Sequence, residues 1–142
     1  FAKAERPVRR GYAFLVQSTR GRILLRQRPE AGLLGGMLEV PSTPWEAALP
    51  PVKEALRSAP VSAEWWQVPG SIIHVFTHFR LELSVYRAIV DEDDALTFWA
   101  DPPRCRWVKR KDLHGEALPS VMRKVIAHGL GEPAAAALNS RS

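Results

Sequence analysis

One segment of this chain has the glycine-rich run that typically precedes a metal-dependent phosphate site, but it has few of the acidic residues that such a site needs. The glycine-rich run 32–41, GLLGGMLEVP, is followed by residues 53–61, KEALRSAPV. On a helix, carboxylates at positions i, i+3 and i+4 share one face and together can hold Mg²⁺ against a diphosphate. Here Glu54 is followed at those spacings by Arg57 and Ser58. A guanidinium one turn from a single carboxylate predicts a poor magnesium site, and without its neighbours the segment would read as an ordinary amphipathic helix.

A second run, HVFTH at residues 74–78, combines an aromatic ring, a hydroxyl and two imidazoles. The ring of Phe76 could wedge between base steps, as apolar side chains do in DNA-bending proteins. The hydroxyl of Thr77 can accept a hydrogen bond, and His74 and His78 can donate one. Structural roles compete with these readings. A Phe between two strands is typical of a core, and a zinc site would need more ligands than cluster here.

The strands that position these residues follow from the apolar pattern. In residues 79–90, Phe79, Leu81, Leu83 and Val85 alternate with more polar residues, which is the period of a half-buried strand. Other strands are expected in a hairpin over 12–28, briefly over 37–40, at an edge near 64–68, over 71–77 and at the start of 104–113.

The helices are expected between and after these strands. Residues 43–46, Thr-Pro-Trp-Glu, have the form of a capping box with proline at the first helical position. Two prolines at 50 and 51 should break or restart that helix, which places the main helix over about 51–58, closed by Pro60. A closing amphipathic helix is expected over 119–130. The order of elements predicts a mixed α+β domain.

Composition bounds the class of protein. The 142 residues form one domain by size, with 46% hydrophobic and 25% charged residues, as in a globular protein. No apolar run is long enough for a membrane helix, and the N-terminus, which begins at Phe1, has no signal-peptide pattern. A single cysteine fits a reducing cytosol, so a cytoplasmic location is expected. The net charge of +5 favours polyanions such as nucleic acid.

The run 53–61 falls in register with the second half of the Nudix hydrolase signature, G-x5-E-x7-R-E-U-x-E-E-x-G-U, where U is apolar. Lys53 replaces the arginine and Glu54 is retained, whereas Arg57 and Ser58 stand where the paired acids belong. Pro60 replaces the glycine, and the first half of the signature is contracted. The resemblance implies the fold of this family without its hydrolase acids.

Three stretches together are similar to the C-terminal domain of MutY-type adenine DNA glycosylases. They are RPEAGLLGGMLEVP, HVFTHFRLEL and RWVKRKDLHGEALPSVMRKVI, and the resemblance covers about residues 8–128. It implies a Nudix-like α/β/α sandwich with a mixed central sheet, over residues 11–130. Residues 1–10 would be a linker from an upstream catalytic domain, and residues 131–142 a flexible tail.

The same resemblance implies a role in base-excision repair. The domain would recognise 8-oxoguanine opposite adenine in double-stranded DNA, and the upstream domain would remove the adenine. The parent protein would carry a 4Fe–4S cluster upstream of Phe1, since a cluster needs four thiolates and this chain has only Cys105. The fragment itself would be non-catalytic and would hold no metal. It would act as a monomer and, in a bacterium, would be associated with the nucleoid.

The resemblance also nominates the site residues. In 8-oxoguanine, N7 carries a hydrogen and C8 a carbonyl, so a reader needs an acceptor aimed at N7–H. We expect Phe76 and Thr77 to read the lesion first, then His74 and His78; the family often has Ser where Thr77 stands. In the glycine-rich loop, Leu33 and Gly35 have two possible roles. They could let backbone amides approach the DNA closely, or they could form the turn that positions strand 37–40. The candidates for phosphate contacts are the basic residues Arg9, Arg10, Arg26, Arg28, Arg80, Lys109, Arg110 and Lys111.

Two other functions stay open at this point. A Nudix hydrolase of nucleoside diphosphate derivatives would need a non-standard metal site, against which Arg57 and Ser58 argue. A protein-interaction scaffold would keep only the fold, and an exposed apolar patch around Trp65 and Trp66, with no response to DNA, would favour it. Adjacent strand residues face opposite sides, so one of these two tryptophans can be exposed.

Overall fold

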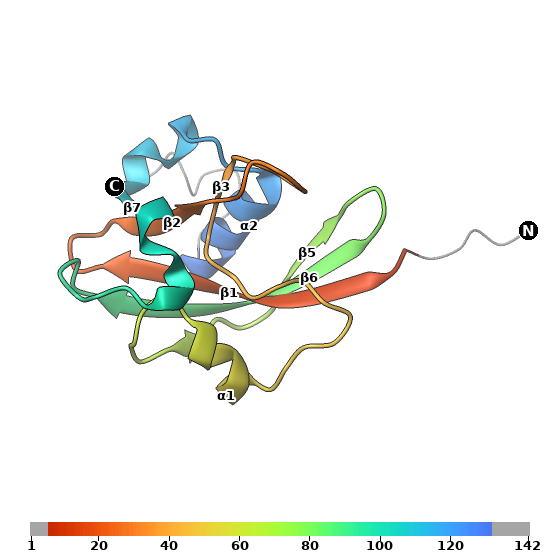
Figure 1. Cartoon of the computed structure of the whole chain (residues 1–142), viewed down its shortest axis with the longest axis horizontal. Coiled ribbons are helices and arrows are strands. Elements are labelled where there is room, and N and C mark those ends of the chain that lie inside the picture. Colours follow the sequence, from red (N-terminus) through yellow and green to blue (C-terminus); the bar gives the residue numbers. More distant parts are fainter. Residues whose placement is uncertain (1–5, 132–142) are drawn as a thin grey trace, which may run out of the picture.

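The computed structural model describes residues 6–131 of the chain. Its sheet has two long strands at the centre, β1 (Val8–Ser18) and β6 (Arg80–Val90), and five shorter ones around them (Figure 1). The shorter strands are β2 (Ile23–Gln27), β3 (Leu38–Glu39), β4 (Trp66–Gln67), β5 (Ile72–Val75) and β7 (Cys105–Val108). The helices are α1 (Val52–Ala55) and α2 (Ser120–Gly129), with 3₁₀ turns η1 (Leu56–Ser58), η2 (Phe98–Ala100), η3 (Pro102–Arg104) and η4 (Arg110–Gly115).

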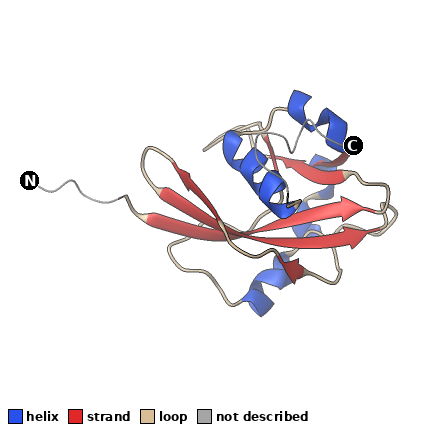
Figure 2. Ribbon diagram, turned by 180° about the vertical axis from the view of Figure 1, so that it is seen from behind, coloured by secondary structure: helices blue, strands red, loops and turns tan. Residues whose placement is uncertain are grey.

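The two central strands run parallel along their whole length, from the pair Val8–Arg80 to the pair Ser18–Val90. The other strand pairs are antiparallel, so the sheet is mixed, with the order β3-β2-β1-β6-β4. Helix α2 lies on one face and α1 on the other (Figure 2). The α+β sandwich expected from the sequence is therefore the observed architecture.

Strand β1 is buried on both faces, as expected for a central strand with an unbroken apolar run. Ala13 and Leu15 face the core under α2, which includes Val121, Met122, Val125 and Ile126. Tyr12 and Phe14 face a second core under α1. Strand β6 was predicted to be half-buried, but Tyr86 is also buried, because its ring packs edge-on against Tyr12 with centroids 5.6 Å apart.

The predicted secondary structure is correct for the 12–28 hairpin, the strands near 64–68, 71–77 and 79–90, the turn after β7 and the closing helix. The main helix occupies the expected place but is brief: one α-helical turn at Val52–Ala55 continues as η1 and ends before Pro60. Among the described residues, no helix is long and apolar enough to cross a membrane.

The helix expected at 43–46 does not form. Instead, this segment runs beside the N-terminal half of β1, away from the end that pairs with β2, with bridges from Ser42 to Ala13 and from Glu46 to Arg10. The Thr43 hydroxyl accepts a hydrogen bond from the Tyr12 N–H at 2.9 Å, so it satisfies a strand and not a helix terminus. Backbone pairing with the part of β1 that β2 does not cover thus outcompeted the local capping signal.

The boundary of the expected linker also differs from the structure. Strand β1 starts at Val8, so residues 8–10 belong to the sheet, and the Pro7 carbonyl accepts the Arg80 N–H at 2.8 Å. Residues 1–5 of that linker and residues 132–142 of the expected tail lie outside the described part of the chain.

Candidate nucleic-acid interface

The turn between β5 and β6 projects from one end of the sheet and carries the HVFTH run (Figure 1). The turn is closed by a hydrogen bond from the Phe76 N–H to the Phe79 carbonyl, at 2.8 Å. Thr77 and His78 lie at its tip and are exposed, whereas Phe76 is half-buried. The Thr77 carbonyl already accepts a bond from Arg6 Nε at 3.2 Å.

Phe76 belongs to an aromatic cluster that holds its ring in place. Trp45 stacks on it, with centroids 5.9 Å apart and planes inclined by 28°, and Phe79 lies 4.8 Å away. The imidazole of His74 meets the same ring edge-on at 4.8 Å. Two guanidinium groups lie over outer rings, that of Arg9 at 4.4 Å from the Phe79 centroid and that of Arg28 at 5.2 Å from Trp45. Phe76 is thus a braced ring at the rim of the core and not fully inside it.

His74 points its Nδ1 at the ammonium of Lys124 on α2, at 3.0 Å. Burial lowers the pKa of His74 from its usual value, and the charge of Lys124 lowers it further. An ammonium can only donate, so Nδ1 accepts and the ring proton of the neutral imidazole sits on Nε2. His74 can therefore donate one hydrogen bond from Nε2.

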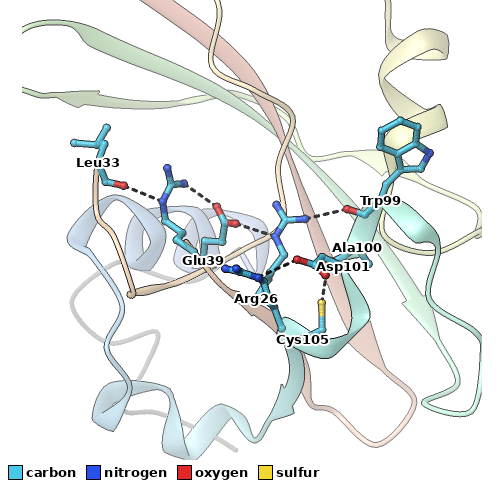
Figure 3. Close-up of polar contacts among 9 residues, drawn as sticks. Arg26, Leu33, Glu39, Trp99, Ala100, Asp101 and Cys105 are labelled. Carbon is cyan, nitrogen blue, oxygen red and sulfur yellow. Dashed lines mark hydrogen bonds and ion pairs between the residues drawn. The ribbon is translucent and has the colours of Figure 1, made fainter. Parts of the chain in front are cut away.

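A carboxylate that the sequence analysis missed organises the neighbouring strands. Glu39 of β3 is only 5% exposed, and its two oxygens accept bonds from Arg26 Nε and from an Arg28 terminal nitrogen, both at 2.8 Å. Arg26 also donates to the Trp99 carbonyl at 3.1 Å, and Arg28 Nε donates to the Leu33 carbonyl at 3.0 Å (Figure 3). We call Glu39, Arg26 and Arg28 the arginine clamp.

Arg26 and Arg28, two of the predicted phosphate contacts, are bonded to Glu39 within the protein. The side chain of Arg26 is 18% exposed and is held on Glu39, so it orders strands β2 and β3. Arg28 links Glu39 to the loop and to Trp45, and through Trp45 to Phe76. A charged residue inside the apolar run MLEV was the signal for a buried partner, because a buried carboxylate is rarely left unpaired.

The glycine-rich loop closes tightly beside the clamp. A Cβ at Gly35 would lie 2.0 Å from the Glu30 carbonyl oxygen, so only glycine fits this position. Gly36 has φ +74° and donates its N–H to the Pro29 carbonyl at 3.0 Å. Leu33 is 41% exposed at the apex. Gly35 therefore shapes the turn that leads into β3, which is one of the two roles considered for it.

An open groove joins the loop to the aromatic cluster. It has a volume of about 360 Å³ and is lined by Arg9, Arg26, Arg28, Pro29, Leu33, Glu39, Ser42, Thr43, Pro44 and Trp45. Since Trp45 lines the groove and stacks on Phe76, the structure brings Leu33 and the β5–β6 turn to one surface. Trp45 was not among the predicted site residues, because the sequence of 43–46 predicts a helix start.

The remaining predicted residues lie elsewhere or are partly engaged. Arg80 is exposed next to the turn, 3.8 Å from Glu82, which also lies 3.5 Å from Arg10. Lys109 and Arg110 line a different cavity with Gln17, at the opposite end of β1. Ten residues of strand separate these ends, a distance of about 30 Å. They do not form one site with Phe76.

The segment that resembles a metal-binding helix offers a poor ligand set. Lys53, Glu54 and Arg57 are exposed, and Ser58 Oγ donates to the Ala55 carbonyl at 2.9 Å. Within residues 6–131, no three His, Cys, Asp or Glu side chains are grouped as a metal site would require. Cys105 is the chain's one cysteine, and its Sγ lies 3.1 Å from the Ala100 carbonyl, so these residues do not fit an iron–sulfur cluster.

The apolar surface near β4 has the predicted two-sided form. Trp65 packs against Phe14 with centroids 5.3 Å apart, whereas Trp66 is 45% exposed. The guanidinium of Arg87 lies over the Trp66 ring at 5.8 Å. This surface is on a different strand from the β5–β6 turn.

Comparison with known proteins agrees with this geometry. Residues 12–128 match the NUDIX domain family. The chain is 30% identical over 125 residues to the adenine DNA glycosylase of Homo sapiens, an alignment that covers 84% of this chain and 22% of the human protein. The chain therefore spans about a fifth of the length of the curated relatives it matches.

Solved structures give the same result. The C-terminal domain of mouse MUTYH, solved in complex with human PCNA, superposes with a TM-score of 0.64 at 26% identity over 94% of both chains. The MutT protein of Methanosarcina mazei Go1 superposes with a TM-score of 0.63 at 20% identity, over 87% of this chain and 93% of that one, and so shares the fold. The chain belongs to the NUDIX domain family, and within it resembles the C-terminal domain of adenine DNA glycosylases.

Proposed function

We propose that this domain is the lesion-reading module of an adenine DNA glycosylase. It would recognise 8-oxoguanine opposite adenine in a DNA duplex, with the β5–β6 turn as its reading element. Removal of the adenine, and the iron–sulfur cluster, would belong to an upstream part of the parent protein. The observation that carries the proposal is the exposed Thr77 at the tip of a turn whose neighbouring ring, Phe76, is braced by Trp45 and Phe79.

The hydrogen-bonding groups of the turn suit the lesion. The N7–H of 8-oxoguanine can donate a hydrogen bond to an acceptor on the protein. Guanine cannot make this bond, because its N7 carries no hydrogen and is itself an acceptor. The Thr77 hydroxyl lies on an exposed residue and can accept this bond, whereas the Thr77 carbonyl already has a partner in Arg6. The Nε2–H of neutral His74 is a donor of the kind that the C8 carbonyl requires.

The position of Phe76 suits a side chain that enters a base step. Such a wedge must resist being pushed back into the protein, and unstacking one step costs a few kcal/mol. Stacking on Trp45 and contact with Phe79 supply that resistance. The clamp extends the support inward, because Arg28 joins Trp45 to the buried Glu39. Arg9, whose guanidinium lies over the Phe79 ring, and the exposed Arg80 would supply phosphate contacts beside the turn.

The hydrolase alternative has weaker support. It would require Glu54 to work with Arg57 and Ser58, where the family signature has acids. A cation at that position competes with Mg²⁺ for the carboxylate. The similarity to MutT extends to the fold alone.

The proposal is tested by an NMR titration of the chain with a short duplex that contains 8-oxoguanine opposite adenine. The control is the same duplex with guanine, at one low salt concentration, because tethered reader modules can bind weakly when isolated. We expect lesion-dependent shifts at Phe76, Thr77 and His74. Identical shifts with both duplexes, spread over the basic residues, would contradict lesion reading.

A further inference from the structure

A basic cavity lies at the end of the sheet opposite the β5–β6 turn. It has a volume of about 770 Å³ and is lined by Gln17, Arg20, Gly21, Arg22, Lys109, Arg110 and Lys111. Two segments distant in sequence form it, the β1–β2 turn and the start of η4. Antiparallel pairing of β2 with β7, which places Ile23 opposite Val108, brings them together. We call this the basic pocket.

Little negative charge balances the basic pocket. Glu92 accepts bonds from Arg22 at 2.8 and 2.5 Å and from Ser18 Oγ at 2.6 Å, so its two oxygens are already engaged. These bonds, those from Arg22 first, lower the pKa of Glu92, and Arg20 adds a smaller attraction. Within residues 6–131, neither Lys109 nor Lys111 forms an ion pair, and both are exposed.

A further cation lies behind the wall of the pocket. Arg87 of β6 contacts the Gln17 side-chain oxygen and donates to the Gly129 carbonyl at 3.3 Å, while its buried Nε has no hydrogen-bond partner among the described residues. Burial lowers the pKa of Arg87, and the charge of Arg110 lowers it further, which shows that the two guanidinium groups repel each other. Cations gathered around one hollow create a potential that favours an anion with several charges.

We propose that the basic pocket binds phosphate groups, about 30 Å from the lesion-reading turn along β1. The pocket is concave, and its donors are lysine and arginine side chains. The Gly21 N–H is already donated to the Ser18 carbonyl at 2.8 Å, but Gly21 leaves the entrance open, because a methyl group added to its Cα would meet no atom within 4 Å. The phosphates can come from the backbone of a duplex or from a free nucleotide. A duplex that spans both ends of β1 would need about nine base pairs. This inference does not depend on lesion reading.

The test uses the double variant Lys109→Ala/Lys111→Ala and the matched control Lys53→Ala/Arg57→Ala, which removes the same charge from exposed positions near α1. Inorganic pyrophosphate is titrated into ¹⁵N-labelled protein. We expect saturable shifts at Gly21 and residues 109–111, weakened about fivefold or more in the pocket variant and unchanged in the control. Amide spectra of the free variants check that both fold.

A second arm identifies the source of the phosphate. The affinity for an undamaged duplex of about 20 base pairs is measured against salt, where losing two phosphate contacts lowers the slope by about 1.8. Such a change in the pocket variant assigns the pocket to the DNA backbone, and pyrophosphate binding without it assigns the pocket to free phosphates. The proposal is overturned if pyrophosphate gives no saturable shifts at the pocket and the salt slope for the duplex is the same in the pocket variant as in the wild type, or if both variants weaken binding equally. Loss of lesion discrimination alone would leave it standing.

Discussion

The β5–β6 turn and helix α1 both carry residues that the sequence marks as chemical, but the fold supports them very differently. At the turn, Phe76 stacks on Trp45. Arg28 lies over the Trp45 ring and forms an ion pair with the buried carboxylate of Glu39. Helix α1 is a single turn that is followed by a 3₁₀ turn, and its Glu54 is exposed. The difference teaches that the fold rigidly supports the β5–β6 turn but gives no such support to the helix that resembles a metal site.

The arginine clamp gives the largest expected contrast between these regions. Replacing Glu39 by alanine leaves Arg26 and Arg28 partly buried without their partner, which we expect to cost about 3–5 kcal/mol in the free energy of unfolding. Glu54→Ala, the matched change on α1, should cost less than about 0.5 kcal/mol. Urea unfolding of the two variants measures both values, and equal losses would mean that the clamp adds no support.

A smaller effect is expected from the pH dependence of His74. Its pKa is lowered in the folded state by burial and then by Lys124, so the unfolded chain binds the proton more readily. The stability associated with neutral His74 is therefore full above pH 6.5 and is lost as the pH falls below the unfolded value of about 6.5.

The measurement is the free energy of unfolding at pH 7.5 and 5.5 for the wild type and for His74→Asn. The loss between the two values should be smaller in the variant, because asparagine does not titrate. Parallel curves for the two proteins would show that His74 does not couple protonation to folding.

Most of the strands and helices could be predicted from the sequence, because apolar periodicity and proline positions are local signals. The alternation after Phe79 located β6, and the prolines at 51 and 60 bounded the segment formed by α1 and η1. The HVFTH run was correctly placed at a turn between strands. These features depend on neighbours in the chain, which is why they could be predicted.

The parts that were missed depend on pairing between distant segments. Trp45 reaches Phe76 only because residues 42–46 line the edge of β1, where tertiary pairing overrode a capping signal. The partner of Glu39 follows from the β2–β3 register that sets it opposite Arg26. The basic pocket likewise requires β2 to pair with β7. The charge of Glu39 within MLEV signals that a partner exists but not which residue it is, and the other two contacts have no local signature.

The most direct test of the central claim compares lesion discrimination in variants of the two regions. The quantity is the ratio of the Kd for a guanine–adenine duplex to the Kd for the matched 8-oxoguanine–adenine duplex. In the wild type we expect the lesion to be favoured by about 1–3 kcal/mol, the value of a good base contact. Thr77→Val, which keeps the shape and removes the hydroxyl, and Phe76→Ala should bring the ratio close to one, whereas Glu54→Ala should leave it unchanged. An unchanged ratio in both turn variants, or its loss in Glu54→Ala, would contradict the account.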